Sequence, residues 1–320
     1  MHPREHDLVI GTHGRGAYIL DDVRPLRGST ADVLTQPVHL FDPPPAYQVI
    51  LGQPAGYRFT GATMFRGENR RNGAMISYSV ADTSARVRAE ILDGDDVIRT
   101  LQGSRDHGVN RVRWDFRREA GEDGPRVVAL PGTYTVRVRV GDTEVTKPLE
   151  VRQDPRMNIS LADRQEKYDT LVAFGRDVGV LRQITRQIRN TLRMLDPLVT
   201  NVLSGSDSTT RALRTQGREL RDALRALREE INPSSSIQGI NRDPNSVSAK
   251  VSQANSMLQS SWEAPTATEA VYMQQARVAV QALVAKADRV YAQEYAAFRS
   301  ALQAAQLDPF PAVEPFRPGN

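Results

Sequence analysis

Cysteine is absent from the 320 residues of this chain, and its absence excludes two classes of site. Neither a disulfide framework nor a metal site built on thiolates is possible. Long apolar runs are also missing, since none approaches the roughly 20 residues that a membrane-spanning helix requires. The first residues lack the apolar core of a secretory signal. The sequence therefore predicts a chain with no membrane span and no signal peptide of its own.

Lysine is scarce, because only Lys147, Lys167, Lys250 and Lys286 occur among the 42 basic residues. The excess over 38 acidic residues gives a formal net charge of +4. The arginines are distributed over expected strands and helices rather than gathered into a stripe with aromatic neighbours. We therefore expect no nucleic-acid partner.

Two cores are expected from the length, since a mass of 35.5 kDa exceeds what one ordinary domain holds. Near the N-terminus, two short β-type runs at 8–12 and 17–20 flank the turn 13–16 and predict a hairpin. A lone hairpin is marginal in water, so these strands need partners that the preceding residues do not supply. Residues 28–72 are rich in helix and strand breakers and predict linker and long loop.

From Ala74 the pattern changes to alternation of apolar and polar residues, as in half-buried strands. Examples are Val112, Trp114 and Phe116, which alternate with arginine and aspartate. Several such strands, separated by turn signals such as residues 93–96, favour an antiparallel Ig-like β-sandwich.

After the last expected strand, the apolar spacing changes to three and four residues. Ser160 and Asp163 form a capping signature for a long helix, whose apolar stripe occupies residues 171–195. A second and a weaker third helix follow, and Thr266 with Glu269 forms a capping box that opens a last helix. Helices with one apolar stripe each can bury their stripes against one another only in a bundle. The fold class predicted is α+β, with an antiparallel helical bundle after the sandwich.

None of the five histidines is convincing as a metal ligand or a catalytic base. His2 and His6 have the i, i+4 spacing of helical ligands, but the terminal position and Pro3 argue against a rigid site. His13 stands in a glycine-flanked turn, where a hydrogen-bonding role is favoured. The remaining two histidines are His39 and His107.

The remaining candidates also favour structural roles. The adjacent acids Asp21 and Asp22 point to opposite faces if they lie on a strand, and Asp95 with Asp96 belongs to a hairpin turn. Residues 13–16 lack the lysine and the following helix of a phosphate loop. Trp114 is favoured as core over a sugar-binding platform. We expect no catalytic, cofactor-binding or metal site in this chain.

Residues 7–27, DLVIGTHGRGAYILDDVRPLR, resemble the closing blade of bacterial sortilin-like β-propeller proteins with BNR repeats. The segments that follow are similar to the C-terminal region of the same proteins, more loosely in the helices. They are LFDP at 40–43, FRGEN at 65–69, GAMISY at 73–78, GVNRVRWD at 108–115 and PGTYTV at 131–136.

This resemblance implies that a whole family member carries a signal peptide and a large propeller and works in the periplasm or outside the cell. Together with the strand and helix patterns above, it predicts four parts in this chain. Residues 1–45 are a blade remnant with linker, 46–153 the Ig-like sandwich, 154–307 the helical bundle and 308–320 an extended proline-rich tail.

Three functional hypotheses remain open at this stage. The leading one is a non-catalytic accessory module that docks on a propeller, in the same chain or in a separate one. The alternative is the end of an extracytoplasmic glycosyl hydrolase or peptidase-like hydrolase whose active site lies in the propeller. A third is a protein that binds a partner through its long helices.

Overall fold

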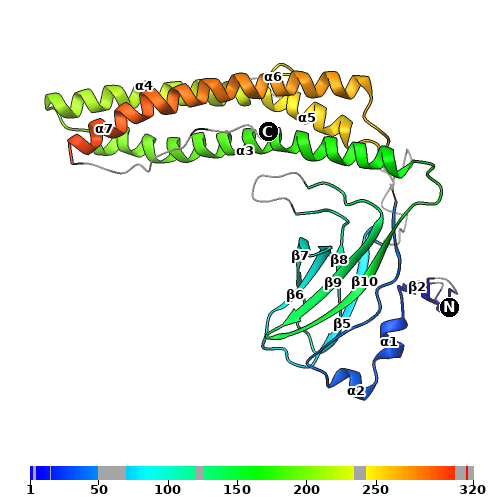
Figure 1. Cartoon of the computed structure of the whole chain (residues 1–320). Coiled ribbons are helices and arrows are strands. Elements are labelled where there is room, and N and C mark those ends of the chain that lie inside the picture. The colour runs from blue at the N-terminus through cyan, green and yellow to red at the C-terminus, as the bar shows by residue number, and fades with distance from the viewer. Residues whose placement is uncertain are drawn as a thin grey trace. The chain divides into compact units, whose positions relative to one another are not determined.

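The chain has a mixed α+β structure with antiparallel sheets and several helices (Figure 1). It divides into two compact units, Met1–Glu119 with Arg126–Asn158 and Ala120–Pro125 with Ile159–Asn320, here called unit 1 and unit 2. The computed structural model describes residues 1–2, 5–14, 16–49, 70–119, 126–233, 243–306 and 315.

Unit 1 contains two larger sheets. The five-stranded sheet has the order β4-β10-β9-β6-β7, and the three-stranded sheet has the order β3-β5-β8. All neighbours pair antiparallel except β4 and β10, which are parallel. The strands are β3 (Val38–Leu40), β4 (Ala46–Gln48), β5 (Ala74–Val80), β6 (Val87–Asp93), β7 (Asp96–Gly103), β8 (Gly108–Trp114), β9 (Gly132–Val140) and β10 (Thr143–Gln153).

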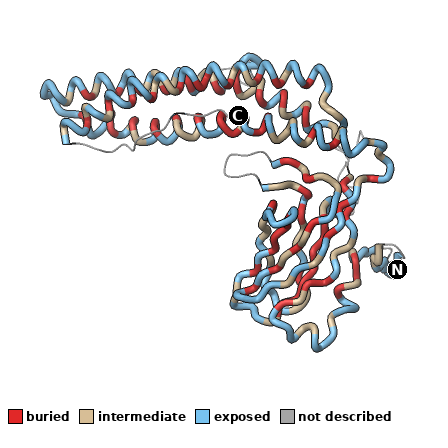
Figure 2. Tube along the Cα trace, in the orientation of Figure 1, coloured by how far each residue is buried: buried red, intermediate tan, exposed pale blue. Residues whose placement is uncertain are grey.

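Alternation along the strands produces the core of unit 1. On β9, Tyr134, Val136 and Val138 are buried, and arginine and threonine occupy the positions between them. Side chains from both sheets join one apolar cluster, which Figure 2 shows as buried segments along the strands. Trp114 is fully buried in this cluster, as the sequence predicts.

The expectation of linker and loop over residues 28–72 is wrong for part of this stretch. β3 and β4 are strands of the two sheets, and the short helices α1 (Arg24–Gly28) and α2 (Ala31–Leu34) precede them. Leu40 on β3 is almost completely buried. Strands of three residues are too short to show a periodic pattern, so tertiary pairing rather than local sequence defines them.

Unit 2 is helical. Ser160 accepts a hydrogen bond from the Asp163 amide, and Thr266 with Glu269 forms a complete capping box, as predicted. The last helix is interrupted by a π-helical segment rather than continuous. The elements are α3 (Leu161–Pro197), η2 (Leu198–Val202), α4 (Ser208–Ile231), α5 (Val247–Leu258), α6 (Ala267–Val290), η3 (Tyr291–Tyr295) and α7 (Ala296–Ala304). None of the described helices combines the length and apolar character needed to span a bilayer.

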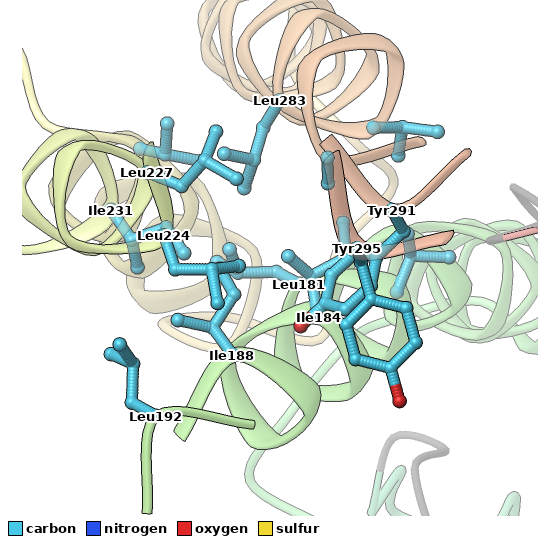
Figure 3. Close-up of a cluster of buried hydrophobic side chains, with 14 of the residues drawn as sticks. Leu181, Ile184, Ile188, Leu192, Leu224, Leu227, Ile231, Leu283, Tyr291 and Tyr295 are labelled. Carbon is cyan, nitrogen blue, oxygen red and sulfur yellow. The ribbon is translucent and has the colours of Figure 1, made fainter. Parts of the chain in front are cut away.

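Contacts between helices define their directions. Lys167 on α3 pairs with Glu269 on α6, and Asp177 pairs with Arg277. Because both pairs join residues about 100 positions apart in the chain, α3 and α6 run parallel. α4 runs antiparallel to α3. α5 comes after α4, and both lie alongside α3 and α6 (Figure 1). In the core, Leu224 of α4 packs among side chains of α3 and α6 (Figure 3).

Candidate protein-interaction site

The hairpin predicted near the N-terminus is present as a sheet of its own. β1 (Leu8–Gly11) and β2 (Ala17–Leu20) pair antiparallel, with Val9 opposite Ile19 and Ile10 opposite Tyr18. The connecting turn is closed by a hydrogen bond from the Thr12 amide to the Gly16 carbonyl oxygen. The hairpin pairs with neither of the larger sheets among the described residues.

Every residue of the two strands is exposed. Because cross-strand neighbours share a face, apolar side chains lie on both faces of the hairpin. The six large side chains have exposed fractions from 37% to 66%, and they are Leu8, Val9, Ile10, Tyr18, Ile19 and Leu20. Single exposed apolar residues are ordinary, but a contiguous group of this kind marks a contact surface.

The two strands of this hairpin lack the residues that usually protect a sheet edge against pairing with another chain. Exposed edges in stable proteins are typically guarded by lysine, proline, bulges or inward charges. The strand sequences LVIG and AYIL contain no charged residue and no proline. No side chain of the two strands therefore opposes the addition of a further strand.

The base of the hairpin is fixed to β8, within unit 1, by a set of hydrogen bonds. Asp7 Oδ1 accepts from the Asp22 amide over 2.9 Å, which joins the two ends of the hairpin. The Arg111 guanidinium on β8 then donates to the carbonyl oxygens of Asp21 and Asp22, each over 3.0 Å. An anchored base presents the apolar strands at a defined place, at a lower entropic cost of docking than a free segment.

The acidic pair at 21–22 is thus a structural part of this anchor. Asp22 is buried, adopts a left-handed backbone with φ of 46°, and accepts a hydrogen bond from Arg24 Nε over 2.6 Å. Sequence reasoning favoured a structural role for these acids but missed Arg111, about 90 residues away. No local signal distinguishes Arg111 from the other strand arginines.

The five histidines are spread over the N-terminal segment, the hairpin turn, β3 and the residue before β8. His2 Nδ1 accepts a hydrogen bond from the Glu5 amide and the His2 carbonyl oxygen accepts one from the His6 amide, but neither histidine belongs to a helix of the described structure. His13 lies exposed in the hairpin turn, and His107 is exposed before β8. His39 on β3 contacts Gln36, and burial together with nearby Lys147 lowers its pKa.

Other candidates also take structural positions. Asp93 and Asp96 close the β6–β7 turn, where Gly94 has φ of 61°. Trp114 donates from Nε1 to the Arg117 carbonyl oxygen and packs edge-on against Tyr134, which contradicts a role as an exposed sugar platform. Among the described residues, no group of three or more histidines and carboxylates could hold a metal ion.

Unit 2 holds a buried ion pair that sequence reasoning did not find. Lys167 Nζ donates to Glu269 Oε1 over 2.8 Å, and both side chains are almost fully buried. Burial would raise the pKa of Glu269, but hydrogen bonds from Lys167 and Thr266 lower it below its ordinary value. Nearby, the Arg164 guanidinium lies 4.2 Å from the centre of the Trp262 ring. These contacts connect the N-terminal part of α3 with the start of α6 and the residues before it.

Comparison of the chain with protein-family models, with curated proteins and with solved structures finds no match.

Proposed function

We propose that this protein is a non-catalytic interaction module that docks on a partner by adding the β1–β2 hairpin to a sheet of that partner. The observation that carries the proposal is the anchored hairpin with six exposed apolar side chains. In this proposal, the two larger sheets form an Ig-like sandwich, and the helices of unit 2 form a bundle that enlarges the assembly.

Sheet addition fits the hairpin better than docking through one face. A two-stranded sheet with apolar residues on both faces gains full burial only inside a layer that is covered on both sides. Strand pairing also satisfies the open backbone groups along the hairpin edge, which face-on packing leaves unpaired. The partner is therefore a β-sheet protein with an open strand edge.

The resemblance of residues 7–27 to a closing propeller blade supports a β-propeller as that partner, in the same polypeptide or as a separate chain. The module then works in the periplasm or outside the cell, where the resemblance places such proteins. Any glycosyl hydrolase or peptidase-like activity of the assembly belongs to the propeller.

The test begins with the DNA immediately upstream of Met1, where we expect in-frame BNR-like repeats. The encoded propeller is then expressed with the present chain and purified through a tag on the propeller. We expect co-purification that is lost in the double variant Ile10→Asp and Ile19→Asp, which places a charge on each face of the hairpin. Val97→Asp, at an exposed position on β7, is the matched control.

Two results would contradict the proposal. One is an upstream sequence that encodes no propeller repeats, together with a failure of the chain to bind any separately expressed β-propeller. The other is co-purification that persists in the hairpin double variant, which would place the contact elsewhere on the chain.

A further inference from the structure

A groove of about 850 Å³ opens on unit 2 between α3 and the end of α4. Ile188, Leu192 and Ile231 line its floor and belong to the core of unit 2. Figure 3 shows these three side chains where α3 approaches the end of α4. The groove lies where α4 stops at Ile231 while α3 continues, so no described part of α4 covers α3 at this level.

The sides of the groove are basic. Arg189 and Arg193 of α3 and Arg228 of α4 line it, and Arg189 and Arg193 are exposed. Glu229 is the single carboxylate among the described lining residues. The groove therefore combines an apolar floor with a rim of positive charge.

The arginines of α3 continue this rim as a straight stripe. Their spacing of four, three and four residues places them on one side of the helix, over a length of about 16 Å. The stripe consists of Arg182, Arg186, Arg189 and Arg193. Asp177 and Asp196, which lie on α3 before and after the stripe, pair with Arg277 and Arg225.

We propose that this groove binds an acidic amphipathic helix of a protein partner. Carboxylates spaced by four, three and four residues on such a helix repeat at the same rise as the arginines, so consecutive pairs can form along its length. Its apolar side chains then rest on the floor of Ile188, Leu192 and Ile231. The groove is on unit 2, so the proposal does not depend on the hairpin.

A helical protein segment fits this surface better than nucleic acid does. Single-stranded nucleic acid is held by aromatic side chains interleaved with basic ones. The sequence from 175 to 261 contains no phenylalanine, tyrosine or tryptophan. Segments of the chain itself fit less well, because residues 234–242 contain no carboxylate and residues 307–320 contain four prolines, which oppose a helix.

The experiment measures binding of a labelled synthetic helix of about 18 residues by fluorescence anisotropy with the full chain. The peptide carries glutamate at the spacing of four, three and four and leucine on the adjacent stripe. We expect binding that weakens with added salt. The double variant Arg189→Glu and Arg193→Glu should weaken it about tenfold or more, because like charges then face each other.

Arg289→Glu, an exposed position on α6 that does not line the groove, is the matched protein control and should bind normally. A peptide of the same composition with its glutamates moved off the stripe should bind about tenfold more weakly. Circular dichroism of each variant checks that the helices remain folded. Equal binding of both peptides, or unchanged binding by the double variant, overturns the proposal. Tighter binding of an oligonucleotide, or displacement of the acidic peptide by a peptide of residues 307–320, also overturns it.

Discussion

Trp114 shows how a single residue organises unit 1. Its ring is fully buried, lies 5.1 Å from the ring of Tyr134, and hydrogen bonds to the Arg117 carbonyl oxygen. We expect Trp114→Ala to cost about 3–5 kcal/mol in the free energy of unfolding, because the deletion leaves a cavity. Trp114→Phe, which keeps most of the ring, should cost less. Urea melts measure both, and a loss below about 1 kcal/mol for alanine would contradict full burial.

The Lys167–Glu269 pair gives a second prediction, because removing one partner should lower the free energy of unfolding more than removing both. Lys167→Met leaves the Glu269 carboxylate buried without its cation and should cost about 3–5 kcal/mol. The double variant Lys167→Met and Glu269→Leu should recover much of that loss. Denaturant melts of the three proteins test this, and a double variant as unstable as the single one would contradict it.

The same pair gives a dependence on pH with a definite sign. The pKa of Glu269 is lower when the protein is folded than its ordinary value. Its contribution to stability is therefore complete above the ordinary pKa and is lost as the pH falls through the lowered one. Wild-type unit 2 should lose more stability on acidification than the Lys167→Met and Glu269→Leu double variant.

Residue-level prediction from the sequence succeeded where the signal is local and failed where it is not. The burial of Trp114 follows from alternation along one strand, and the Thr266–Glu269 capping box follows from a spacing of three. Arg111 and Lys167 act on partners roughly 90 to 100 residues away, which a single sequence does not reveal.

At the scale of elements, Gly217 explains how α4 approaches its neighbours. A Cβ at this position would lie 2.6 Å from Val199 Cγ2 and 3.1 Å from the Phe298 ring. On an exposed helix, Gly→Ala gains stability, but here we expect Gly217→Ala to lose about 1–3 kcal/mol through overpacking. Thermal melts would show it, and Gly217→Ala together with Val199→Ala should restore part of the loss. A stabilised Gly217→Ala protein would contradict the close approach.

The elements themselves were predictable in proportion to their length. The long helices and the alternating strands were found because many residues repeat one pattern. β3 and β4 were missed because three residues carry no period, and the π-helical segment η3 was missed because its sequence YAQEY continues the helical stripe. The hairpin was found from its sequence, but its anchor on β8 needed the structure.

At the scale of the whole molecule, we expect the isolated chain to have no hydrolase activity. Cleavage of a glycoside or peptide bond needs at least two groups that converge on it. The candidate acids lie in turns or in the anchor, and no group of three or more histidines and carboxylates that could hold a metal ion is present among the described residues. A screen against aryl glycosides, polysaccharides and peptides, alone and fused to the upstream propeller, measures this. Turnover by the isolated chain that is abolished by one Asp, Glu or His substitution would contradict it.

The most direct test of the docking role is hydrogen exchange in the hairpin, measured for the purified chain alone and with the propeller. Alone, the hairpin is one small sheet with both faces exposed, so its opening costs little. Ile10 and Tyr18 form a hydrogen-bonded pair across the hairpin, so their amides report its opening. We predict fast exchange of the Ile10 and Tyr18 amides in the free chain and, in the complex, protection that approaches that of Val136 and Val138 on β9. Protection of Ile10 and Tyr18 in the free, monomeric chain as strong as that of Val136 and Val138 would contradict the account.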